Sequence, residues 1–144
     1  MAEKEIERRL CQRFSLPGAM VSYRRQGFLH KARGFDEDFC PVLDFNRDGI
    51  RFLTQRLMKF RSQVAVEISV PGERVPFDLR GRVRWSSQNA GTVYKYQTGI
   101  QFNSWGEGEE KNYPGNLVKI IALEQKSTGR NAFDEAAQQG KLSF

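Results

Sequence analysis

Residues 74–85 read RVPFDLRGRVRW, and the alternation of apolar and charged side chains in this stretch decides the fold. Apolar residues at 75, 77, 79, 83 and 85 would face one way, and charged residues at 74, 78, 80, 82 and 84 the other. A period of two is typical of a strand with one buried face. Because strands usually span about five or six residues, we expect this one to bend, with Gly81 as a bulge or barrel corner.

Further strands are predicted on both sides of this stretch. Residues 64–70 alternate cleanly and lead into it through the turn Pro71-Gly72-Glu73, while residues 92–102 alternate after it and would complete a hairpin. Earlier strands are predicted at 14–23, interrupted by Pro17-Gly18, and at 39–45 and 50–53. Alternation within 39–45 would place Val42, Asp44 and Asn46 on one face and Leu43 and Phe45 on the other.

The ends of the chain follow different patterns. Apolar residues within 115–124 recur at helical spacing, which predicts a helix that plugs one barrel mouth. We expect residues 1–13 to form a mobile arm and residues 126–144 a flexible tail or a short helix at 133–138. The prediction is therefore a mainly β fold: a six-stranded antiparallel (split) β-barrel with a C-terminal α-helix over residues 14–125, and an N-terminal arm.

Composition narrows the classes of function. With 23 Lys and Arg against 17 Asp and Glu, the chain carries a formal charge of +6 and a pI near 9.6, which favours anionic partners. No apolar run approaches the about 20 residues of a membrane span, and no signal-peptide pattern opens the chain, so we expect a cytoplasmic protein with no membrane partner.

Cysteine and histidine content argues against catalysis and metal binding. Cys11 and Cys40 are interpreted as reduced thiols, and with the single His30 they lack metal-ligand spacing. No Ser/His/Asp or Cys/His arrangement can be assembled. We therefore expect no enzyme activity, no metal and no cofactor.

A cluster of arginines precedes the first strand. Residues 7–14 read ERRLCQRF, and Arg9 and Arg13 are four residues apart, a spacing that puts both on one face of a helix or a strand. Two guanidinium forks that point the same way suit a bidentate anion such as phosphate. The alternative is a solvated basic face on a short amphipathic helix.

A second polar motif, Asp44-x-Asn46-x-x-Gly49, falls at the end of the predicted strand 39–45. Asn46-Arg47-Asp48-Gly49 is a tight-turn sequence, in which Gly49 would supply a left-handed or otherwise strained conformation. Without the preceding arginines, Asp44 and Asn46 would be interpreted as polar caps of a turn.

Together the two motifs resemble the PilZ domain family, whose signature is RxxxR followed by (D/N)xSxxG. Residues 81–85 and 99–102 also look like the paired closing strands of that family, so the resemblance covers residues 7–124. One position departs from the signature, because Asn46 stands where the family has serine. Asn46 keeps hydrogen-bonding capacity but adds bulk.

The resemblance implies a six-stranded barrel with a C-terminal helix that binds the bacterial second messenger cyclic dimeric GMP (c-di-GMP). Arg9 and Arg13 would grip its phosphates and guanine edges. Asp44 would accept from guanine N–H groups, and Gly49 would let the turn approach the ligand. Arg8 is similar to its counterpart in members that bind an intercalated pair of ligand molecules.

Trp85 is either a stacking wall for the ligand or a residue of the barrel core. The favoured hypothesis is a non-enzymatic receptor whose arm folds over c-di-GMP and signals to an unknown protein partner. Two alternatives remain: a PilZ-like adaptor that has lost nucleotide binding, and, less favoured, a barrel that binds single-stranded nucleic acid through its basic face and Tyr94 or Tyr96.

Overall fold

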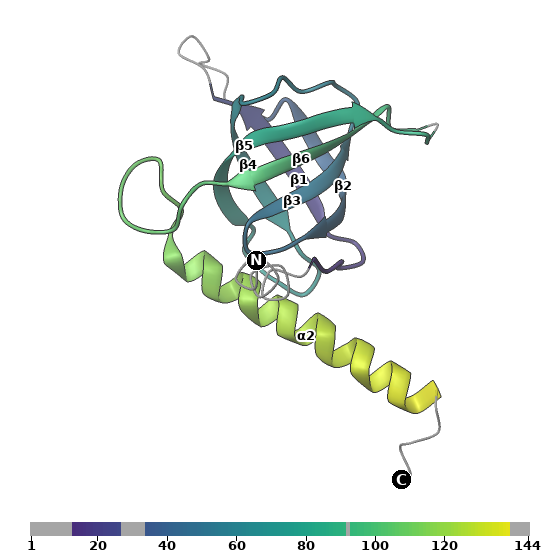
Figure 1. Ribbon diagram of the computed structural model, residues 1–144. Coiled ribbons are helices and arrows are strands. Elements are labelled where there is room, and N and C mark those ends of the chain that lie inside the picture. The colour runs from purple at the N-terminus through teal and green to yellow at the C-terminus, as the bar shows by residue number, and fades with distance from the viewer. Residues whose placement is uncertain (1–12, 27–33, 92, 139–144) are drawn as a thin grey trace, which may run out of the picture.

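The computed structural model describes residues 13–26, 34–91 and 93–138, with side chains as far as residue 127. Within these ranges a mainly β fold is present, a closed barrel of six antiparallel strands followed by a helix, as the sequence predicts (Figure 1). The elements are β1 (Met20–Arg25), β2 (Glu37–Phe45), β3 (Gly49–Thr54), β4 (Gln63–Ser69), β5 (Phe77–Gln88), β6 (Tyr96–Phe102) and α2 (Pro114–Gln138).

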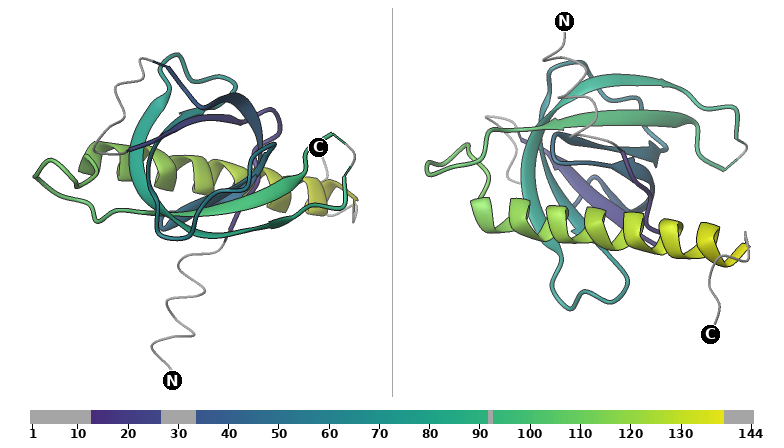
Figure 2. Two further views of the ribbon diagram at one scale, coloured as in Figure 1. Left: turned by 90° about the horizontal axis from the view of Figure 1, so that it is seen from above. Right: turned by 60° about the horizontal axis from the view of Figure 1, so that its bottom comes forward.

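The strands close into a ring in the order β1-β2-β3-β6-β5-β4, and the left view of Figure 2 shows this ring end-on. The hairpins β4–β5 and β5–β6 are paired as predicted. The first is joined by the turn at Gly72, whose φ of 92° lies in the region that glycine adopts without steric cost. In that turn the Glu73 N–H donates to the Val70 carbonyl at 3.0 Å.

Side chains from all six strands fill the barrel interior. Fully buried side chains include Val21, Phe45, Ile50, Phe52 and Val64. Burial of apolar area of this kind is the main driving force for closing the ring, at about 25 cal/mol per Å².

Helix α2 runs across one end of the barrel (Figures 1 and 2). Ile120 and Leu123 are buried and belong to the same apolar core as the strands. Arg47, in the β2–β3 turn, also forms an ion pair with Glu124 at 3.2 Å. The helix therefore covers the barrel end at which the β2–β3 turn lies.

The helix is longer than the sequence pattern predicts. The pattern places its end near Glu124, whereas α2 continues to Gln138. Residues 132–138 read AFDEAAQ, a stretch rich in strong helix formers and free of proline, and such residues extend a helix even without an apolar stripe. None of the helical segments that the structure describes is long and apolar enough to cross a bilayer.

The bend predicted at Gly81 is not a bulge. Gly81 pairs in regular register with Val64 and Phe102, and the register of β5 shifts only between Val83 and Trp85. A Cβ on residue 81 would lie 2.4 Å from the Gln101 carbonyl oxygen, so glycine permits a close approach of β6 there.

A polar group is built into the barrel wall near β1 and β2. The Tyr23 hydroxyl donates to Glu37, whose other carboxylate oxygen accepts from the Gln55 N–H at 2.7 Å. Burial, followed by the Glu37 carboxylate, raises the pKa of Tyr23 well above its usual value. Burial and the same carboxylate raise the pKa of Cys40 to about 12.

Candidate functional site

The chain enters the barrel through Phe14, and this contact fixes the position of Arg13. Phe14 and Phe45 exchange both backbone hydrogen bonds, at 3.0 and 2.9 Å, and their ring centroids lie 4.4 Å apart. Phe14 is buried at 8% exposure. The residue that precedes it is therefore held beside the end of β2, where Asp44 lies.

Asp44 is the centre of a three-residue charge cluster. Its Oδ1 accepts from Arg13 Nη1 at 2.8 Å, and its Oδ2 accepts from Arg51 Nη2. The Asp44 side chain is only 14% exposed, whereas those of Arg13 and Arg51 are 47% and 38% exposed. The structure therefore brings Arg13 and Asp44 together across the two motifs, and it adds Arg51.

A bulge in β2 explains why Asp44 faces outward. The register between β2 and β3 shifts between Val42 and Asp44, so that Asp44 pairs with Arg51 on the outer face while Phe45 pairs with Ile50 inside. Val42 packs against the core instead of sharing a face with Asp44. The predicted alternation of residues 42–46 is therefore wrong, because the extra residue of a bulge reverses the faces that follow it.

A row of cross-strand partners extends from Asp44 over four neighbouring strands. Asp44 on β2 pairs with Arg51 on β3, Arg51 pairs with Gly99 on β6, and Gly99 pairs with Trp85 on β5. The sequence prediction names Asp44 and Trp85 as site residues, but not Arg51 or Gly99. Arg51 could have been recognised from the sequence, because it is a charged residue within the strand predicted just after the second motif.

Trp85 lies on the outside of the barrel and is 37% exposed. The register shift after Val83 turns Trp85 outward, so the prediction that it shares a face with Val83 is wrong, as is the alternative of a core residue. The indole lies over Gly99, since a Cβ there would come within 2.5 Å of Trp85 Nε1 and Cε2. A partly exposed aromatic ring is thus held in place by a strand that lacks a side chain beneath it.

Asn46 is a turn residue in this structure. Its Oδ1 accepts from the N–H groups of Asp48 and Gly49, at 2.8 and 3.0 Å, and its backbone N–H donates to the Gly49 carbonyl at 2.9 Å. Asn46 is buried at 6% exposure. The side-chain amide oxygen of Asn46 therefore stabilises the β2–β3 turn.

Gly49 is needed for a different reason from the one predicted. Its φ does not lie in the left-handed region, and it begins β3 opposite Gln101. A Cβ on residue 49 would lie 2.2 Å from the Ile100 carbonyl oxygen. Glycine is required here because the backbone of β6 approaches too closely for any side chain.

Arg8 and Arg9 lie outside the described residues. The first motif is represented by Arg13 alone, and the predicted Arg9/Arg13 face stays a prediction.

The cluster retains capacity for an anion. Two guanidinium groups share one carboxylate, which leaves one net positive charge within the cluster of Arg13, Asp44 and Arg51. Arg51 Nε is buried without a hydrogen-bond partner among the described residues, so it is not open to a ligand in this conformation. Guanidinium groups with free donors bind phosphate and carboxylate oxygens in bidentate geometry.

Comparison with known protein-family models gives no match, and comparison with curated proteins gives none. The class of this protein is therefore defined by its architecture alone, which is a closed six-stranded antiparallel β-barrel with a C-terminal helix. On its outer face this barrel carries an arginine–aspartate cluster in line with an exposed tryptophan.

Proposed function

We propose that this protein is a non-enzymatic receptor for c-di-GMP, in which the residues before Phe14 close over the nucleotide and change the surface offered to a protein partner. The ligand would lie on the outer face of the row from Asp44 to Trp85. The observation that carries this proposal is the ion pair between Arg13 and Asp44. It joins the two motifs on which the resemblance to PilZ domains depends.

The chemistry of the cluster suits this ligand. Its two phosphates and the O6 and N7 atoms of its guanines accept hydrogen bonds, and the free donors of Arg13 and Arg51 can supply them. The guanine N1–H and N2–H groups donate, and a carboxylate such as that of Asp44 accepts. One guanine nucleotide thus offers a partner to each charged group of the cluster.

Trp85 supports the proposal because exposed aromatic rings stack on bases. Each base–aromatic stack contributes about 1–3 kcal/mol. The Trp85 indole lies over Gly99 on β6, two strand spacings from Asp44 on β2. Because neighbouring strands lie about 4.8 Å apart, about 10 Å separates the ring from Asp44. A ligand with several separate recognition groups is needed to contact both ends of the row.

The ion pair between Arg13 and Asp44 is weak enough for a bound ligand to replace it. Arg13 is half exposed, so its ion pair contributes about 0–1 kcal/mol and is easily opened. Micromolar binding needs about 8 kcal/mol, and charge-assisted hydrogen bonds contribute about 1.5–3 kcal/mol each. Because ordering a segment costs about 1–2 kcal/mol per residue, the arginines need both Asp44 and the stacking ring.

Calorimetric titration with c-di-GMP tests the proposal. We expect saturable binding by the wild type, and at least tenfold weaker binding by Arg13→Ala and by Asp44→Ala. Arg56→Ala is the matched control, because Arg56 is an exposed arginine in the loop after β3 whose side chain makes no hydrogen bond within the described residues.

Two outcomes would contradict the proposal. Undiminished binding by Arg13→Ala and Asp44→Ala would place the nucleotide elsewhere on the molecule. Chromatographic recovery of a cleaved nucleotide after incubation would show an enzyme in place of a receptor.

A further inference from the structure

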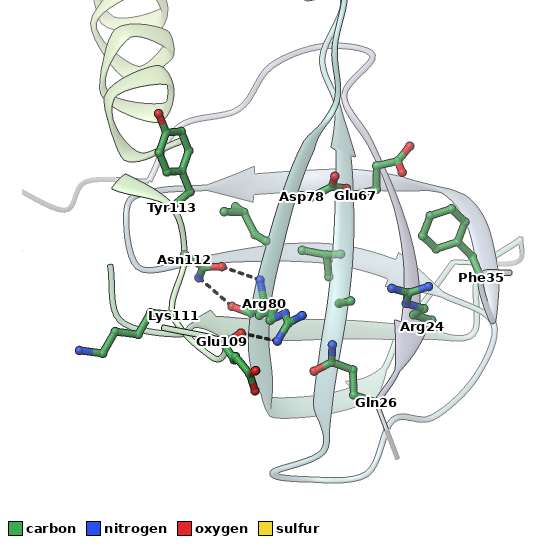
Figure 3. Close-up of a pocket in the computed structure, with 13 residues that line it drawn as sticks. Arg24, Gln26, Phe35, Glu67, Asp78, Arg80, Glu109, Lys111, Asn112 and Tyr113 are labelled. Atoms are coloured by element: carbon green, nitrogen blue, oxygen red, sulfur yellow. Dashed lines mark hydrogen bonds between the residues drawn. The ribbon is translucent and has the colours of Figure 1, made fainter. Parts of the chain in front are cut away.

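A cavity of about 440 Å³ opens on the outer face of β1, β4 and β5 (Figure 3). The row from Asp44 to Trp85 crosses β2, β3, β6 and β5, so the two surfaces share only β5. On that strand Asp78 lines the cavity near one end, and Trp85 lies toward the other. The cavity is therefore a separate surface from the proposed nucleotide site.

Two arginines dominate one half of the cavity, which Glu109 also lines. Ala65 on β4 is the cross-strand partner of Arg24 on β1 and of Arg80 on β5, so two guanidinium groups flank a residue with a very short side chain. Arg80 Nη1 donates to the Glu109 carbonyl, which holds that side chain in place. Arg24 has no ion pair within the described residues. An anionic group can enter between the two arginines.

The other half of the cavity is anionic. Glu67 on β4 pairs directly with Asp78 on β5, and Figure 3 shows their carboxyl groups side by side. Neither carboxylate has a hydrogen bond or an ion pair within the part of the chain that the structure describes. Like charges directly opposite on neighbouring strands destabilise a sheet, and a cation placed between them relieves the repulsion.

The spacing of the two halves matches an extended peptide. Ala65 and Glu67 are two residues apart on β4, which separates the cationic and anionic rows by about 6.8 Å. Residues i and i+2 of an extended chain face the same side at the same spacing. An acidic and a basic side chain two positions apart would therefore each meet the opposite charge.

Exposed aromatic residues flank the cavity. Phe35 and Tyr113 lie at opposite sides of it in Figure 3 and are 37% and 71% exposed. Aromatic residues are enriched in protein interfaces relative to the remaining surface.

We propose that this cavity docks an extended segment of a partner protein that carries one acidic and one basic side chain two residues apart. The acidic side chain lies between Arg24 and Arg80, and the basic one between Glu67 and Asp78. This proposal goes beyond nucleotide binding and does not depend on it.

The test uses defined capped heptapeptides and the amide NMR spectrum of the full chain. The matching probe carries Asp and Lys two positions apart. The mismatched probes carry them at adjacent positions, or carry two Asp or two Lys at the matching spacing. We expect the matching probe to shift the amides of Ala65, Glu67 and Arg80, and the mismatched probes to bind at least fivefold more weakly.

Charge-neutralising variants provide a second test of whether the cavity selects peptides by charge. Glu67→Gln combined with Asp78→Asn should weaken binding of the matching probe at least fivefold. The variant should then bind the Asp/Asp probe more tightly than the matching probe. Glu73→Gln, an exposed turn carboxylate outside the cavity, is the matched control and should change neither. The amide spectra of the free variants verify that they are folded.

The proposal is overturned if the four probes bind equally, or if the matching probe causes no shift at about 5 mM. It is also overturned if a thymidine oligonucleotide shifts the same amides with steep salt dependence, since that result assigns the surface to single-stranded nucleic acid.

Discussion

The indole of Trp85 occupies the space above Gly99, where a Cβ would come within 2.5 Å of both Nε1 and Cε2. The two residues are cross-strand partners, and Gly99 is also the partner of Arg51. The position of the aromatic ring beside the charge cluster therefore depends on a residue that has no side chain.

Gly99→Ala should displace Trp85. The added methyl group overlaps the indole, so the ring must move, at a cost of about 1–3 kcal/mol in the free energy of unfolding. We expect the indole N–H resonance of Trp85 to shift and the affinity for c-di-GMP to fall about tenfold.

Gly34→Ala is the control for this change, because a Cβ there meets nothing within 4 Å and its φ is not positive. If Gly99→Ala leaves the Trp85 resonance in place, the ring is not held by this contact.

Arg51→Ala should weaken c-di-GMP binding about tenfold or more while changing the free energy of unfolding by about 1 kcal/mol or less. The side chain is 38% exposed, so its ion pair adds little stability, whereas it supplies donors to the proposed ligand. Calorimetric titration and urea unfolding measure the two quantities. Arg51→Lys should restore only part of the affinity, since lysine lacks the planar fork. Unchanged binding by Arg51→Ala would exclude it from the site.

Asn46→Ala should destabilise the fold by about 1–3 kcal/mol, because two backbone N–H groups lose their acceptor at a buried turn. Asn46→Ser should cost less, since a serine hydroxyl caps turns more weakly but in the same manner. Urea unfolding measures both, and Asp48→Ala, an exposed change in the same turn, is the control. Equal stability of Asn46→Ala and the wild type would show that the turn does not need this side chain.

Stability should fall in alkaline solution because of Cys40. Burial raises its pKa from about 9 to about 12, so the folded chain keeps the proton that the unfolded chain releases. The contribution of the protonated Cys40 thiol to the free energy of unfolding is complete below pH 9. It is lost as the pH rises towards 12, by at most about 1.4 kcal/mol per pH unit. The raised pKa of Tyr23 acts in the same direction at higher pH.

Urea unfolding between pH 8 and 10.5 in a Cys11→Ser background measures this slope, and Cys40→Ala should flatten it. In the same background, alkylation of the folded chain at pH 8 should be much slower than that of the unfolded chain. Rapid alkylation of Cys40 in the native state would contradict the assigned burial.

The sequence predicted the barrel because a period of two survives along most strands, and it predicted the covering helix from the spacing of Ile120 and Leu123. It failed at Val42, Asp44 and Trp85, since two bulges reverse the inward and outward faces. A bulge is set by the register of the neighbouring strand, and local alternation carries no information about it.

The same limit applies to the candidate site. The motif spacing correctly placed Arg13 near Asp44, because Phe14 begins the barrel and Asp44 ends a strand. Arg51 was missed because it belongs to neither motif. The sequence also predicted that glycine is needed at position 49, but for the wrong reason. Glycine is needed because the backbone of β6 lies close to it, a tertiary contact that turn preferences do not reveal.

The most direct test of the central claim is a titration of the ¹⁵N-labelled chain with c-di-GMP, followed through the two tryptophan indole N–H resonances. We predict that the Trp85 resonance and the amides of Asp44 and Arg51 shift together and saturate, while the Trp105 resonance does not move. Saturable shifts confined to other residues, or no shift at all, would contradict the proposed site.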